Sequence, residues 1–263
     1  MRKQIQKYWK TAAMAASSYT GDSPLFLVDY LLRLLRVLVL LSIWRSLLAG
    51  RGAVSGMTLD AVLTYTLVAE VFAAQLSPRT DFDSTLWTGA IVARLLQPLG
   101  VFGQFSAELF GRWLFEFVVF SGPLLLLAPL LGVSPLPASA AAGGLFALSL
   151  ALAIAVGLAI EFVFGGLLVL LQLPFWAVSQ VRNAVTVLLS GALIPLALLP
   201  PAVGAVFAWL PFAAMASAPL QIYTGTGAPL PLLASQAGWA LALWPLAHWL
   251  WRAGRERMVS YGG

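Results

Sequence analysis

The longest stretches of this chain carry almost no charge. No Asp, Glu, Lys or Arg occurs between Arg182 and Arg252, and Glu161 is the only one between Glu116 and Arg182. The surface of a soluble domain needs charged side chains, and these stretches exceed the roughly 20 apolar residues that cross a bilayer as one helix. The sequence therefore predicts an integral membrane protein.

Composition narrows the architecture to a helical membrane domain. Hydrophobic residues make up 60% of the 263 residues and charged residues 10%, whereas a typical soluble domain is about one quarter charged. At about 20 residues per span, the length allows about five to seven spans plus loops. Alternating strand patterns are absent, and unpaired backbone groups cannot lie in hydrocarbon. We therefore expect an all-α fold and a single transmembrane domain over residues 1–263.

Six apolar segments have the length expected of transmembrane helices. Prolines mark some of their ends, because Pro78 follows the second segment and Pro200-Pro201 follows the fifth. The predicted spans cover about 29–49, 57–77, 112–131, 142–171, 177–199 and 232–251. Residues 1–20 differ, since apolar residues recur there at helical spacing beside Lys3, Lys7 and Lys10. This pattern favours a helix lying in the headgroup layer, with a frayed basic tail as the alternative.

The distribution of basic residues predicts the orientation. With six spans both termini lie on one side, and that side then holds eleven of the fifteen Lys and Arg residues. They are Arg2, Lys3, Lys7, Lys10, Arg79, Arg94, Arg112, Arg182, Arg252, Arg255 and Arg257. Because basic residues concentrate on the cytoplasmic side, we expect both termini in the cytoplasm.

Two connections between the spans are unusual. The one at residues 78–111 is long and mixes polar and apolar residues, with a helix start near Asp83. Such a cytoplasmic helix would expose Phe82, Leu86 and Trp87 for docking to a partner. The external connection at residues 200–231 has six prolines and no charge. Its apolar pieces at 202–210 and 212–220 are too short to span, so they predict a re-entrant helical hairpin packed against protein.

Ionisable residues inside the spans are candidate functional residues, because burying charge in a membrane is costly. Asp29 and Arg33 lie four residues apart, so they share one helix face. A hairpin of the first two spans would bring Arg36 level with Glu70, and an ion pair there would neutralise both. Such a pair either fixes helix packing or lines and gates a transport cavity.

Glu161 is a sharper case. It lies about ten residues above the cytoplasmic end of its span, hence about 15 Å deep at about 1.5 Å per residue. The sequence offers it no evident partner, so it is either protonated or paired with another subunit. Gly165-Gly166, one turn further, indicate a close helix approach or a kink. A charged stripe where the third span enters the membrane consists of Glu108, Arg112 and Glu116.

Several chemistries are excluded or poorly supported. The chain has no cysteine, and its only histidine is His248, so no thiolate or two-histidine metal site is expected. The last lysine is Lys10, so no Gly-Lys-Ser/Thr phosphate-binding loop exists and ATP cannot bind here by that route. We expect no catalytic residues and no bound metal. The basic residues are not gathered on one soluble domain, which argues against nucleic acid as a partner.

These features together resemble the permease subunits of bacterial type-2 ABC exporters. The stretch LWTGAIVARLLQPLG, residues 86–100, is similar to a Gly…Leu-Leu-x-Pro run in one subgroup of those permeases. The stretch LSGALIPLALLPPAVGAVFAWLPFAAMASAPLQIYTG, residues 189–225, is similar to a run of spaced Ser-Gly, Pro and Leu-Pro-Phe in the same subgroup. The resemblance covers nearly the whole chain.

The resemblance implies an assembly in the bacterial inner membrane. Two permease chains, identical or paralogous, would form the pathway, and two ATPase subunits carrying ATP and Mg would bind on the cytoplasmic side. The connection after the second span would hold a coupling helix at about 81–94, and the external hairpin would act as a gate. The implied ATPase-coupling residues are Asp81, Phe82, Asp83, Leu86, Trp87 and Arg94. The implied external gate residues are Pro200, Pro201, Pro211, Phe212 and Pro219. The intramembrane pathway candidates are Arg36, Glu70 and Glu161.

The function we expect is therefore outward transport of a hydrophobic or amphipathic substrate by alternating access, as a non-enzymatic subunit of an ATP-driven exporter. We expect few charges in the cavity walls, which argues against a strongly ionic substrate. One alternative is a six-helix substrate-capture component of an uptake transporter, which would bind its ligand as an isolated chain. The other is an intramembrane lipid-modifying enzyme, which needs a cluster of polar side chains at one depth.

Overall fold

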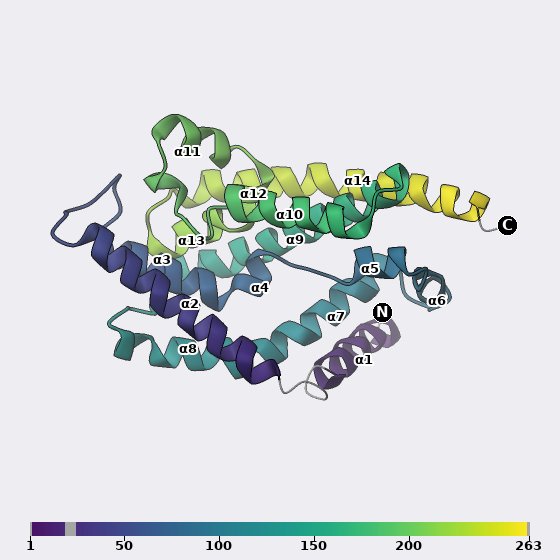
Figure 1. Ribbon diagram of the computed structural model, residues 1–263, viewed down its shortest axis with the longest axis horizontal. Coiled ribbons are helices and arrows are strands. Elements are labelled where there is room, and N and C mark those ends of the chain that lie inside the picture. Colours follow the sequence, from purple (N-terminus) through teal and green to yellow (C-terminus); the bar gives the residue numbers. More distant parts are fainter. Residues whose placement is uncertain (1, 19–24, 262–263) are drawn as a thin grey trace.

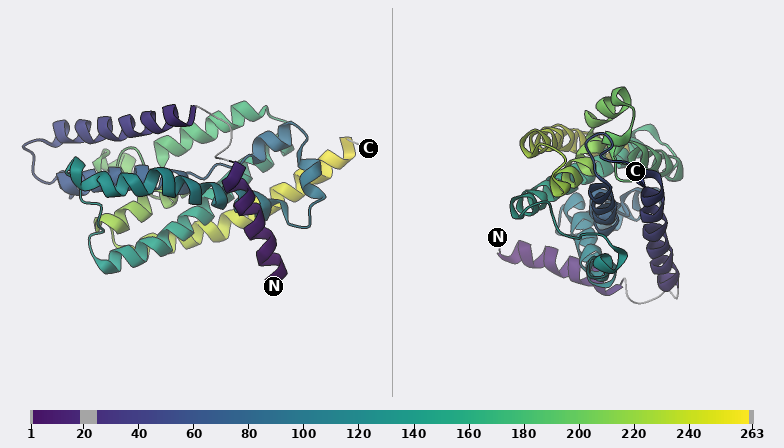
Figure 2. Two further views of the ribbon diagram at one scale, coloured as in Figure 1. Left: turned by 90° about the horizontal axis from the view of Figure 1, so that it is seen from below. Right: turned by 90° about the vertical axis from the view of Figure 1, so that its left-hand side faces the viewer.

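The computed structural model describes the backbone of residues 2–18 and 25–261, and the side chains of residues 6–17, 28 and 30–256. Within these residues the chain is helical and contains no β-strand, so the predicted all-α fold is confirmed. Most of the long helices run along one axis, which Figures 1 and 2 show from three directions. Asp29 and its predicted pair with Arg33 lie outside the described side chains.

The helices differ widely in length, and several predicted spans are interrupted. In chain order the described helices are α1 Arg2–Ser18, α2 Leu25–Leu48, α3 Leu59–Val71, α4 Ala73–Leu76, α5 Phe82–Trp87, α6 Ile91–Leu95, α7 Val101–Glu116, α8 Gly122–Leu127, α9 Ala140–Leu171, α10 Phe175–Leu189, α11 Pro201–Ala208, α12 Pro211–Met215, α13 Ser217–Thr224 and α14 Pro229–Tyr261. A π-helical segment, Phe117–Ser121, joins α7 to α8, and 3-10 segments cover Ala128–Leu131 and Leu196–Leu198.

Three of the described helical segments have the length and apolar composition to cross a membrane. They are Val101–Leu131, Ala140–Leu171 and Pro229–Glu256, and they correspond to the third, fourth and sixth predicted spans. The first of them begins at Val101, well before the predicted start near Arg112, so the connection that follows α4 is shorter than predicted. The polar residues that made this stretch resemble a loop have partners, since the Gln104 amide donates to the carbonyls of Arg94 and Leu99 at 2.9 and 2.7 Å.

The other three predicted spans are less regular. The first is the continuous helix α2, which carries Arg33 and Arg36. The second is divided at Phe72 into α3 and α4. The fifth is helical only to Leu189, because Gly191 takes a positive φ of 76° that ends the helix and turns the chain.

The helices α9 and α14 pack against each other along much of their length. The α9 helix is capped at its start, where the Ser139 hydroxyl accepts a hydrogen bond from the Ala142 amide at 3.1 Å. Glycines let the two helices approach closely, since a Cβ at Gly166 would overlap the Leu250 side chain. The close approach predicted from Gly165-Gly166 is therefore confirmed for α14.

The short helices α11, α12 and α13 connect α10 to α14, in the region predicted to form a re-entrant hairpin. They begin close to the predicted pieces at 202–210 and 212–220, and a break at Ala216 separates α12 from α13. The α11 helix has no buried residue, whereas α12 and α13 pack into the bundle against α9. This region therefore has one exposed arm, α11, and one buried arm, α12–α13.

The bundle has two distinct ends. The elements α1, α5, α6 and the last turns of α14 lie toward one end, which we call the α5 end (Figure 1). The loops after α2 and after the 3-10 segment Ala128–Leu131 lie at the opposite end. The α1 helix runs across the long axis of the bundle (Figure 2), as a headgroup-layer helix would, and packs against α7.

Contact between α1 and α7 depends on a glycine. A Cβ at Gly111 would overlap the backbone of Ala12, whereas one at Gly144 on α9 would meet nothing within 4 Å. We predict that Gly111→Ala destabilises the protein by about 1–3 kcal/mol, because the added methyl forces α1 away from α7. The matched Gly144→Ala variant should be neutral or slightly stabilising, since alanine favours the helix. Thermal melting of both variants in the same detergent checks this, and equal midpoints would contradict it.

Candidate functional site

The segment between α4 and α5 lies along one face of α9. Three α9 residues, spaced four apart, meet alternate residues of this segment. The contacts are Pro78 with Gly157, Thr80 with Glu161, and Phe82 with Gly165. Four residues of helix rise about 6 Å, and two residues of extended chain cover about 6.6 Å, so the spacing from Pro78 to Thr80 nearly matches that from Gly157 to Glu161. At Asp81 (φ −86°, ψ 19°) the chain leaves the extended conformation and enters α5. The segment thus docks on α9 in register over two helical turns, and we call residues 78–82 the docking segment.

Glycine makes the two outer contacts possible. A Cβ at Gly157 would overlap the Pro78 ring, and one at Gly165 would overlap the Phe82 ring. Larger residues at either position would therefore push the docking segment off the helix. The α9 sequence alternates small, acidic and small residues at this face, and the acidic residue makes the central contact.

Glu161 is held by two hydrogen bonds from one residue. Its Oε1 accepts from the Thr80 amide at 2.8 Å and from the Thr80 hydroxyl at 2.9 Å. The Phe82 amide in turn donates to the Thr80 hydroxyl oxygen at 3.2 Å, at the start of α5. The carboxylate is 1% exposed. The expectation that Glu161 has no partner in this chain is therefore wrong, and Thr80 and Arg182 are the partners that sequence reasoning missed.

Arg182 of α10 joins Glu161 to α5. Its Nη1 lies 2.5 Å from Glu161 Oε2 and 2.8 Å from Asp83 Oδ2, and all three side chains are buried. Burial raises the pKa of the Asp83 carboxyl, while the charge of Arg182 acts in the opposite direction. One guanidinium therefore holds carboxylates from α9 and α5 together. We call Thr80, Asp83, Glu161 and Arg182 the Glu161 network.

Phe82 sits in an aromatic cluster beside this network. Its ring lies 5.3 to 5.8 Å from the rings of Phe162, Phe105, Trp251 and Phe102, and it is fully buried. Stacked and edge-on aromatic pairs at this distance add to the stabilisation from burial. The cluster fixes α5 against α7, α9 and α14.

The predicted ATPase-docking residues must therefore be corrected. Phe82 and Leu86, which were expected to be exposed, are buried within the chain and cannot present their side chains to a partner, and the implied coupling residue Asp83 is buried as well. The pattern that suggested docking was an amphipathic helix in a polar connection. Its apolar side chains instead pack α5 against the other helices of the bundle. Of the predicted apolar docking residues, Trp87 is the exposed one, at 56%.

Two further predicted coupling residues bind to α7. The Asp81 carboxylate pairs with Arg112 at 3.2 Å, and Arg94 pairs with Glu108. The Arg94 guanidinium also lies over the Phe105 ring at 4.9 Å. The predicted charged stripe on α7 thus joins separate segments to this helix, since its third member, Glu116, pairs with Arg33 of α2.

Beyond Trp87 the chain exposes a run of apolar side chains at the α5 end. This exposed apolar surface consists of Trp87, Val92, Leu95 and Leu96, with Leu96 exposed at 85%. Sequence reasoning named Trp87 and missed the other three. The available signal was the largely apolar run IVARLL at residues 91–96.

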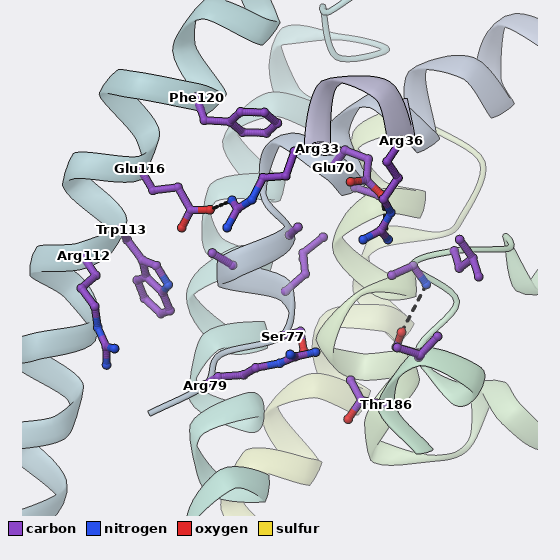
Figure 3. Close-up of a pocket in the computed structure, with 18 of the residues that line it drawn as sticks. Arg33, Arg36, Glu70, Ser77, Arg79, Arg112, Trp113, Glu116, Phe120 and Thr186 are labelled. Carbon is purple, nitrogen blue, oxygen red and sulfur yellow. Dashed lines mark hydrogen bonds and ion pairs between the residues drawn. The ribbon is translucent and has the colours of Figure 1, made fainter. Parts of the chain in front are cut away.

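A cavity of about 420 Å³ opens beside the docking segment. Figure 3 shows the side chains of α2, α3, α7 and α10 that surround it. Arg36 Nη2 lies 3.0 Å from Glu70 Oε1, so the ion pair predicted from the hairpin of the first two spans is confirmed. The pair lines the cavity wall, as does the ion pair between Arg33 and Glu116.

Arg79 extends into this cavity from the docking segment (Figure 3). Successive residues of an extended chain point to opposite sides, so Pro78 and Thr80 face α9 while Arg79 faces away from it. Arg79 has no ion-pair or hydrogen-bond partner among the residues that the structure describes. Four arginines and two glutamates line the cavity, so the expectation of few charges in its walls is wrong. Their number escaped sequence analysis because they come from segments far apart in the chain.

The predicted external gate residues fall on different short helices. Pro200 and Pro201 are exposed at the start of α11, Pro211 and Phe212 are half-buried at the start of α12, and Pro219 is buried in α13. They do not converge on one point. The His248 Nδ1–H donates to the Trp244 carbonyl at 2.8 Å, and the imidazole ring lies 5.1 Å from the Phe102 ring. Among the described residues, no group of three His, Cys, Asp or Glu side chains is placed to hold a metal ion.

The fold and site thus define a helical membrane protein with a buried polar network, an attached helix at one end and a charged cavity. The chain matches the family described as ABC-2 family transporter protein over residues 34–262. It belongs to this family and is the membrane-spanning type of subunit of an ABC transporter. No curated protein and no solved structure matches it.

The Glu161 network generates a stability prediction. Arg182→Met leaves two carboxylates buried without their cation, and we expect a loss of about 3–5 kcal/mol in stability. Adding Asp83→Asn and Glu161→Gln removes both negative charges and should recover part of that loss. Arg252→Met, at an exposed position of α14, is the control and should be neutral. Melting midpoints of the purified proteins check this, and an equal loss in the single and triple variants would contradict it.

Proposed function

We propose that this chain is the permease subunit of an ATP-driven exporter in the bacterial inner membrane. It would act with a second copy or a paralogue and with two ATPase subunits, which carry ATP and Mg. The α5 end would face the cytoplasm together with both termini. The substrate would be an amphipathic molecule moved outward by alternating access, and this chain would carry out no chemistry itself.

The observation that supports this proposal most is how α5 and α6 are held. One side of α5 is fixed by Phe82 and Asp83 to α7, α9, α10 and α14, and the other side leads into the exposed apolar surface. Apolar side chains this exposed at the cytoplasmic end would suit burial against a protein partner. Movement of an ATPase bound there would displace α5, and the helices attached to α5 would have to move with it.

The Glu161 network supplies the route for that movement. Displacement of α5 acts on α9 through Thr80 and on α10 through Arg182. The cavity lies between α10 and the helices α2, α3 and α7, so movement of α10 against them would change its shape. ATP binding and hydrolysis would thereby alternate the cavity between inward and outward access.

The remaining parts of the proposal concern the membrane topology. The divided segment α3–α4 and the helix α10 with the residues after it would complete six crossings together with α2 and the three long helices. The residues predicted as an external gate, Pro200, Pro201, Pro211, Phe212 and Pro219, would then lie at the outer side. The buried arm α12–α13 would close the pathway there, and the exposed arm α11 would contact lipid or the second permease.

The exposed apolar surface can be tested directly. We predict that the double variant Trp87→Glu/Leu96→Glu still inserts and folds, because both side chains face outward, but loses the bound ATPase or its substrate-stimulated hydrolysis at least tenfold. Leu136→Glu, exposed at the opposite end, is the matched control and should leave both unchanged. Co-purification with the ATPase and hydrolysis by the reconstituted complex are the measurements. Normal association and hydrolysis in the double variant would refute the assignment.

A further inference from the structure

We propose that the cavity beside the docking segment binds the anionic group of an amphiphile, with Arg79 as its charge partner. This proposal rests on the transport function and names the substrate class. The apolar part of the amphiphile would lie against the side chains on the α7 and α10 sides of the cavity. These are Leu109, Trp113, Phe120, Val187 and Leu193.

The charges lining the cavity favour an anion. Four guanidinium groups and two carboxylates line it, which leaves two formal positive charges in excess. Arg33 and Arg36 have carboxylate partners within the wall, and Arg112 is paired with Asp81, whose side chain is mostly exposed outside the cavity. Arg79 has no ion-pair or hydrogen-bond partner among the described residues, so its guanidinium is available to a ligand. A planar guanidinium binds phosphate or carboxylate through two parallel hydrogen bonds.

Unused hydrogen-bond donors lie in the same wall. Nε and Nη2 of Arg112 and the indole Nε1 of Trp113 are buried without a hydrogen-bond partner. The Trp113 side chain is more than nine-tenths buried, and Figure 3 shows its ring turned toward the group of cavity residues. Buried donors without partners cost free energy, which a ligand that accepts hydrogen bonds would relieve after a small rearrangement. The hydroxyls of Ser77 and Thr186 also line the cavity.

The size and lining of the cavity favour an amphiphile over a bare ion. About 420 Å³ is within the range of small-molecule sites and far larger than one phosphate needs. Aromatic and aliphatic side chains form the rest of the wall. An anionic head group with a short apolar chain fills both parts, whereas a cation of the same shape would meet the excess positive charge.

The position of Arg79 connects ligand binding to the Glu161 network. Arg79 stands between Pro78 and Thr80, both of which contact α9. A ligand that draws Arg79 further into the cavity pulls on the residue that supplies both hydrogen bonds to Glu161 Oε1. Occupancy of the cavity is thereby communicated to α5, three residues further along the chain.

Binding of decyl phosphate to the full chain in phosphatidylcholine nanodiscs tests this proposal, with binding to empty nanodiscs subtracted. We expect Arg79→Gln to weaken binding about tenfold or more and Arg79→Lys to retain part of it, because lysine keeps the charge. Arg51→Gln, an exposed arginine in the loop at the opposite end, is the matched control and should bind normally. Because no ATPase is present, this result is independent of the ATPase association tested above.

Competition on the unaltered chain provides a second readout that needs no variant. Unlabelled decyl phosphate should displace labelled decyl phosphate from the chain. Decyltrimethylammonium, which has the same tail and the opposite charge, should not. Inorganic phosphate should compete only weakly, since it lacks the apolar chain. Equal competition by the cationic amphiphile, or undiminished binding by Arg79→Gln, would overturn the anion site. Competition by inorganic phosphate as strong as that by decyl phosphate would overturn the amphiphile and leave a free anion as the ligand.

Discussion

Glu161 lies in the middle of an otherwise apolar helix. Its contact with Thr80 fixes the position of the docking segment, which leads from α4 to α5. Two hydrogen bonds to one carboxylate oxygen hold the docking segment on α9, while Gly157 and Gly165 let the neighbouring residues reach the helix surface. The residues on either side of Thr80 then contact different parts of the bundle. Phe82 enters the aromatic cluster, Asp83 meets Arg182, and Arg79 turns the other way into the cavity.

A buried group of two carboxylates and one arginine is a costly way to hold two helices together, since the desolvation of three charges opposes their attraction. Apolar side chains would hold α5 on α9 with less free-energy cost, but they would permit many registers. Hydrogen bonds from Thr80 to one oxygen permit a single register. We infer that the network serves to specify where α5 sits and to return it there after movement. That requirement suits a protein whose helices shift in each transport cycle.

Sequence reasoning succeeded where the relevant information is local. The long apolar runs gave α9 and α14, and the pair Arg36–Glu70 followed from the turn that joins two neighbouring helices. It failed where contacts join distant segments. Thr80 and Glu161 are 81 residues apart, and nothing near either residue identifies the other. Phe82 and Leu86 looked like the exposed face of a cytoplasmic helix because the helices that cover them come from elsewhere in the chain. The spacing Gly157, Glu161, Gly165 was the one local sign of a chain docked on α9.

The cavity and the exposed apolar surface both involve the same short stretch of chain, since Arg79 lines the cavity and Trp87 begins the exposed surface. Arg79 faces the cavity, Thr80 binds α9, and Trp87 faces outward seven residues later. Any event that moves one of these positions must act on the others, because Pro78 and the buried Phe82 leave the stretch little freedom. In the function proposed above, coupling between a ligand and an ATPase would therefore need no long path through the bundle. It would require two states of one docked segment, with the cavity favouring one and the nucleotide state of the ATPase favouring the other.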